Sequence, residues 1–134
     1  MTFRLVRELA AGGVRVAVAC RVLCVSAAGY YEFNFSPSLE WAAYHFSSYR
    51  DGMTPAHLSR APGLRSRKTS DRLELTATVH LEGLPELAAA PVLRLALTAV
   101  VEDDSGRLSY WALRHARGNP DFHDPEGFAL ELHR

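Results

Sequence analysis

Residues Arg72–Glu82 read RLELTATVHLE, and their apolar and polar side chains alternate along the chain. The apolar members are Leu73, Leu75, Ala77, Val79 and Leu81. A β-strand points successive side chains to opposite faces, so this stretch predicts a strand with one buried face and one wetted face. The buried face needs a second layer of structure to cover it.

The chain that follows predicts a hairpin. Val92–Glu102 carries apolar residues on both parities, which indicates a more central strand. The turn residues Asp103–Gly106 then lead into a further strand-like run that reaches His115. Gly106 tolerates the positive φ that a short hairpin loop needs.

A second hairpin is predicted upstream, where the aromatic-rich segments Tyr30–Phe35 and Trp41–Ser47 flank a turn at Ser36–Ser38. Near the end of the chain, Phe128, Leu130 and Leu132 share one parity and predict a closing strand. Leu84–Val92 leaves room for one helical turn before Pro91.

Residues Asp51–Ser70 show no sustained periodicity, and we expect a surface excursion there. Short strands joined by turns, with little helix, predict an all-β fold, an antiparallel β-sandwich of the jelly-roll or immunoglobulin-like kind. A chain of 134 residues with 48% hydrophobic content fits one such domain.

The charge and hydropathy of the sequence limit the kinds of partner that we expect the protein to bind. The chain has 15 Lys plus Arg and 15 Asp plus Glu, a net charge of +0 that argues against a nucleic-acid partner. No stretch approaches the ~18 consecutive apolar residues of a membrane span. Arg15 and Arg21 interrupt the apolar part of the opening segment, which opposes export. We therefore expect a soluble, cytoplasmic protein with no membrane partner.

Enzyme signatures are missing from the sequence. It contains no G-x-S-x-G, no nucleotide-binding glycine loop and no H-E-x-x-H. The sequence therefore predicts no catalytic residues and favours a protein that is not an enzyme.

An aromatic and polar cluster gives the candidate binding site. Its members are Tyr30, Tyr31, Glu32, Asn34, Trp41, Tyr44, Tyr49, Arg50, Tyr110 and Trp111. A sugar presents apolar faces to aromatic rings and takes hydrogen bonds from polar side chains. Aromatic residues that simply fill the space between two sheets are the alternative interpretation, above all for Phe33, Phe35 and Phe46. Tyr110 and Trp111 are adjacent in a strand and so cannot both be core.

Three further groups of residues are weaker candidates. His115, Asp121 and His123 could supply two imidazoles and a carboxylate to one metal, or form a turn in which Asp121 caps local amides. Met53 and one histidine could form an axial haem pair. A basic run is the candidate for phosphate contacts or, alternatively, a solvated loop. It comprises Arg60, Arg65, Arg67, Lys68 and Arg72.

Three segments together resemble the bacterial DOMON-like domain proteins, which are similar to family 9 carbohydrate-binding modules. They are GYYEFNFSPSLEWAAYHFSSYRDGM, VVEDDSGRLSYWALRH and NPDFHDPEGFALEL, and the resemblance covers Gly29 to Leu132. It implies a β-sandwich domain at residues 29–134 after an atypical N-terminal segment at residues 1–28. Relatives have a longer lead-in, so the resemblance leaves open whether N-terminal strands are lacking.

Members of this family bind a sugar in some cases and a haem in others, while many have no assigned activity. Carried over by position, the resemblance implies a set of ligand-binding residues in this chain. They are Glu32, Asn34, Trp41, Tyr44, Arg50, Trp111 and His123.

Three hypotheses follow for the function. The first is a non-catalytic binding module for a carbohydrate or a similar polar small molecule, in which Trp41 and Trp111 stack on the ligand and Glu32, Asn34 and Arg50 hydrogen-bond to it. The second is a haem- or metal-binding β-sandwich. The third is an interaction domain that pairs through an open sheet edge and has no small ligand. Oligomeric state is not fixed by the sequence.

Overall fold

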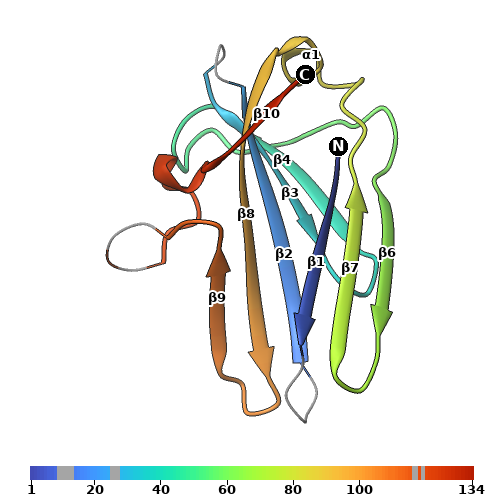
Figure 1. The fold of residues 1–134 in the computed structure, drawn as a ribbon. Coiled ribbons are helices and arrows are strands. Elements are labelled where there is room, and N and C mark those ends of the chain that lie inside the picture. Colours follow the sequence, from blue (N-terminus) through green and yellow to red (C-terminus); the bar gives the residue numbers. More distant parts are fainter. Residues whose placement is uncertain (9–13, 25–27, 116–117, 119) are drawn as a thin grey trace.

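The alternating stretch forms strand β7 (Arg72–Thr78), the middle strand of a three-stranded sheet. Strands β1 (Thr2–Glu8) and β6 (Gly63–Lys68) pair with it on either side, both antiparallel. Leu73, Leu75 and Ala77 are each 2% exposed, as the alternation predicts. This sheet forms one layer of the molecule (Figure 1).

The computed structural model describes residues 1–8, 14–24, 28–115, 118 and 120–134, and at residues 7, 8, 14, 15, 19, 20 and 24 it describes the backbone alone. The second layer is a seven-stranded sheet of order β10-β8-β2-β3-β4-β5, with β9 pairing beside β8. Its strands are β2 (Val14–Cys24), β3 (Tyr30–Phe35), β4 (Trp41–Phe46), β5 (Thr54–Pro55), β8 (Val92–Asp103), β9 (Leu108–Ala112) and β10 (Leu130–His133). The two layers pack together, so the predicted antiparallel β-sandwich is confirmed.

Both predicted hairpins and the closing strand are present. Strands β3 and β4 pair from Tyr30↔Phe46 to Phe35↔Trp41, and β8 pairs with β9 through a turn in which Gly106 has a φ of +80°. Strand β10 pairs with the first part of β8. The predicted helical turn is α1 (Pro85–Ala89), and a 3-10 turn, η1 (Pro125–Gly127), precedes β10.

The expected surface excursion at Asp51–Ser70 is mostly exposed, but it contains β5 and the six-residue strand β6, which the sequence did not predict. Strand β6 lies at a sheet edge and its residues are mostly exposed, so arginines stand where a central strand would carry apolar residues. Its hydrophobic alternation is therefore too weak to recognise.

The N-terminal segment at residues 1–28 contributes to both layers. Strand β1 belongs to the smaller sheet, while β2 lies between β8 and β3 in the larger one and pairs with β8 from Val14↔Asp103 to Cys24↔Leu93. Within the described residues, no helix has the length and hydropathy that a bilayer crossing requires.

The core lies between the two sheets. Its largest fully buried side chains are Phe33, Leu75, Leu87, Leu93, Val22 and Val79. Phe33, Val22 and Leu93 come from neighbouring strands of the larger sheet, and their alternate neighbours in sequence must point to the opposite, outward side of that sheet.

Candidate functional site

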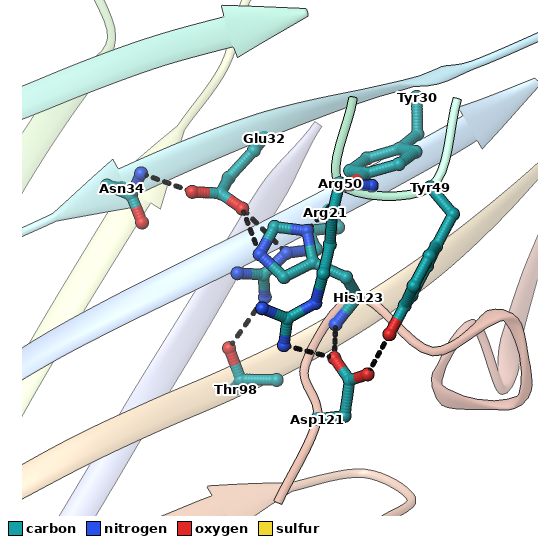
Figure 2. Close-up of polar contacts among 9 residues, drawn as sticks. All are labelled: Arg21, Tyr30, Glu32, Asn34, Tyr49, Arg50, Thr98, Asp121 and His123. Carbon is teal, nitrogen blue, oxygen red and sulfur yellow. Dashed lines mark hydrogen bonds and ion pairs between the residues drawn. The ribbon is translucent and has the colours of Figure 1, made fainter. Parts of the chain in front are cut away.

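The outward side of the larger sheet carries polar side chains at the centre of the sheet, where charge is unexpected. The register pairs Arg21 of β2 with Glu32 of β3, and Glu32 with Tyr44 of β4. Directly paired residues share a face, so these three side chains lie on the side opposite Val22 and Phe33. Figure 2 shows the polar contacts that surround Arg21 and Glu32.

Arg21 and Glu32 form a buried ion pair at the centre of the site. They are only 5% and 8% exposed, and Arg21 Nε lies 2.7 Å from Glu32 Oε2. The N–H of Nε is not aligned with that oxygen, and neither atom has a hydrogen-bond partner among the described residues. The contact is therefore ionic, and each charge depends on the other for compensation.

Two neutral side chains hold this pair in place. Arg21 Nη1 donates a hydrogen bond to Thr98 Oγ1 of β8 at 3.2 Å, and Asn34 Nδ2 donates to Glu32 Oε1 at 2.8 Å. Thr98 is 5% exposed, whereas Asn34 is half-buried. The ion pair is thus held by Thr98 of β8 on one side and by Asn34 of β3 on the other (Figure 2).

His123 covers one end of the pair. Its Nδ1 shares a 2.6 Å hydrogen bond with the Tyr30 hydroxyl, its Nε2 lies 3.9 Å from Glu32 Oε2, and its ring meets Phe46 edge-on at 5.3 Å. The Tyr30 oxygen accepts from the Arg50 backbone N–H at 3.4 Å, which leaves its proton for Nδ1. Burial lowers the pKa of His123, and the Arg21 charge acts in the same direction, so the imidazole is neutral at pH 7.

Asp121 ties the C-terminal loop to the turn after β4. Its carboxylate accepts hydrogen bonds from the Tyr49 hydroxyl, from Arg50 Nη2 at 2.8 Å and from the His123 backbone N–H at 2.9 Å. Partial burial would raise the pKa of Asp121, but the hydrogen bonds outweigh it and lower the pKa to about 2. Arg50 has a φ of +54° in this turn. The predicted cap of a local amide by Asp121 is confirmed.

The structure brings five of the seven predicted ligand-binding residues together. Glu32, Asn34, Tyr44, Arg50 and His123 lie on the outward side of the larger sheet or in the loops beside it.

Trp41 and Trp111 lie elsewhere. The register pairs Trp41 with Phe35 and Trp111 with Ala99, which are both buried in the core. Both tryptophans therefore lie on the core-facing side of the larger sheet. They are 42% and 46% exposed because they stand toward the margins of the sandwich. A ligand bound beside Glu32 would therefore not stack on either ring, and Tyr110 takes the outward position next to Trp111, as the alternation predicts.

Trp111 lines a separate, apolar groove of about 220 Å³ on the core-facing side. The groove lies between β1 and the β8–β9 pair, and Phe3, Leu5, Leu97 and Leu113 line it as well. The third hypothesis, association of this protein with a partner through an open sheet edge, remains a prediction.

The metal and haem candidates do not assemble into a ligand set in the part of the chain that the structure describes. No group of three or more His, Cys, Asp or Glu side chains is placed there to hold a metal ion. The Asp121 carboxylate is engaged by Tyr49 and Arg50, and His123 Nδ1 faces Tyr30. His115 is exposed, and Met53 is 59% exposed. Both alternatives remain predictions.

Stability should depend on pH through His123. A folded-state pKa below the ordinary value of about 6.5 means that the unfolded chain binds more protons below neutrality. The free energy of unfolding should therefore fall as the pH drops from about 7.5 to about 5. Urea unfolding across this range should give a shallower slope for His123→Gln. Equal slopes in wild type and His123→Gln would contradict this assignment.

The fold and the site define a β-sandwich that carries a buried ion pair and half-buried polar groups on the outward side of its larger sheet. Comparison of the chain with protein-family models, with curated proteins and with solved structures gives no match. The resemblance to DOMON-like domains therefore remains a prediction.

Proposed function

We propose that this chain is a non-catalytic binding module that holds a carbohydrate or a similar polar small molecule on the outward side of the larger sheet. The proposal rests on Asn34 and Tyr44, two half-buried polar side chains that lie beside the buried Arg21–Glu32 ion pair on the outward side of the sheet. A ligand can reach half-buried groups, whereas the ion pair itself is buried and holds Asn34 through its hydrogen bond to Glu32. A hydroxyl of a ligand, able to donate and accept, could bond to either side chain.

The residues around the pair suit a polyhydroxylated ligand. Asn34 donates to Glu32, but its amide oxygen and the Tyr44 hydroxyl have no hydrogen-bond partner within the described residues. Both side chains are half-buried and lie on the same side of the sheet as Glu32. The Tyr44 ring offers an apolar surface to a sugar face, while Asn34 and Glu32 offer directional polar groups.

Binding should be tested with a panel of neutral mono- and oligosaccharides, by calorimetric titration and thermal unfolding. A ligand present at about 100 times its Kd raises the free energy of unfolding by about 2.7 kcal/mol. Asn34→Ala should weaken the affinity about 10-fold, which is about 1.4 kcal/mol. Trp111→Phe, on the other face of the sheet, is the matched control and should keep the wild-type affinity.

Several results would decide against this proposal. If no sugar of the panel changes the melting temperature or gives a binding heat, carbohydrate binding is wrong. If Trp111→Phe weakens binding as much as Asn34→Ala, the site lies elsewhere. A Soret band in the purified protein would favour the haem alternative instead.

A further inference from the structure

The outward side of the smaller sheet is unusually basic. Because Leu73 and Leu75 point into the core, Glu74 and Thr76 point outward, and the register places their partners on the same side. We call this surface the basic face. It comprises Arg4, Arg65, Arg67, Arg72, Glu74 and Thr76. Its three strands lie side by side in Figure 1.

The charge of the basic face is only partly compensated. Glu74 lies 2.8 Å from Arg4 and 3.9 Å from Arg72, and it is the one carboxylate among the described side chains of this face. Arg65 and Arg67 are exposed and have no ion-pair partner within the described residues. Among the described side chains of this face, four arginines therefore stand against one glutamate, in a chain of net charge +0, and the backbone register also pairs Glu8 with Arg72.

The arginines form a spaced array on the outward side of the smaller sheet. Arg4 on β1 and Arg65 on β6 flank Thr76 in one register row, so their strands stand about 10 Å apart across β7. Arg65 and Arg67 are about 7 Å apart along their strand. A hollow of about 200 Å³ where β6 turns into β7 is lined by Arg67 and Arg72 and also by Thr69, Asp71 and Glu74.

We propose that the basic face binds an anionic polysaccharide, a chain that carries carboxylate or sulfate groups at regular intervals. Guanidinium groups bind such planar or multi-oxygen anions through paired hydrogen bonds, and the Thr76 hydroxyl adds a neutral partner between two arginines. The surface lies on the opposite side of the sandwich from the site near Glu32, and the inference does not depend on the function proposed above.

Other polyanions fit this face less well. Single-stranded nucleic acid is held largely by bases stacked on aromatic rings, and the described side chains of the basic face include none. Binding to an anionic membrane usually adds several apolar side chains that enter the lipid, whereas Val6, the register partner of Glu74, is the one large apolar side chain exposed on this face among the described residues.

Affinity electrophoresis of the full chain in native gels tests the inference. Gels that contain polygalacturonate or dextran sulfate should retard the protein, and gels that contain neutral dextran should not. Added salt should weaken the retardation. Arg65→Gln with Arg67→Gln should lower the affinity about 10-fold or more. The matched control removes the same charge elsewhere, by Arg107→Gln with Arg114→Gln, and should change the affinity less than about 2-fold.

The outcomes separate the possible ligands. Retardation by only one of the two polymers identifies carboxylate or sulfate as the recognised group and supports the inference. Equal losses in both double variants, or no retardation by either polymer, would overturn it. Tighter binding to single-stranded DNA, to phosphatidylserine vesicles or to polyglutamate would assign the face to a different partner. Thermal unfolding of each variant checks that the fold is retained.

Discussion

Replacement of Arg21 by Met is expected to lower the free energy of unfolding by about 3–5 kcal/mol, because it leaves the Glu32 carboxylate buried without its cation. Urea unfolding measures this loss. Arg21→Met combined with Glu32→Leu removes both charges and should recover most of the lost stability, since an apolar pair of similar volume often replaces a buried ion pair at little cost. The double-mutant cycle then gives the coupling energy of the pair.

The control for this experiment is an exposed ion pair in the same sheet. Arg94 and Glu131 approach to 2.9 Å across β8 and β10, with side chains 48% and 45% exposed. Arg94→Met should cost less than about 1 kcal/mol, because water already solvates both charges. Similar losses for Arg21→Met and Arg94→Met would mean that Arg21 and Glu32 are not buried in the folded protein.

The fold was predictable where burial differs between the two sides of a strand. In β7 every second side chain is buried in the core, and the sequence therefore has apolar residues at every second position, Leu73, Leu75 and Ala77. Strand β6 lies at an exposed edge and has few apolar residues, so its sequence shows no apolar alternation from which a strand could be predicted. Pairing partners, by contrast, are long-range: no local pattern shows that β2 lies between β8 and β3.

The site was predictable only in part for the same reason. Glu32 and Asn34 are two residues apart in one strand, so their shared face follows from the sequence. Arg21 joins them through the β2–β3 register and Thr98 through the β2–β8 register. The sequence feature that could have identified Arg21 as a site residue is its position within an apolar segment. We interpreted that position only as an argument against export. Aromatic composition grouped Trp111 with this site, although its pairing with Ala99 places it on the other face.

The alternation that predicts the sandwich can be tested within β7 itself. Leu75 is 2% exposed and lies in the main core cluster, between the two sheets. Leu75→Ala is expected to lower the free energy of unfolding by about 2–5 kcal/mol, the transfer free energy of the removed methyl groups plus the cost of the cavity that remains. Urea unfolding of wild type and variant gives this difference.

The neighbouring residue supplies the control for Leu75→Ala. Thr76 is half-exposed on the outward side of the same strand, so Thr76→Ala leaves no cavity and should cost less than about 1 kcal/mol through its effect on strand propensity. The contrast between adjacent positions depends only on which side of the sheet each residue faces. If Thr76→Ala proved as destabilising as Leu75→Ala, the one-sided burial of β7 would be wrong, and the outward orientation of the arginines paired beside it would be wrong as well.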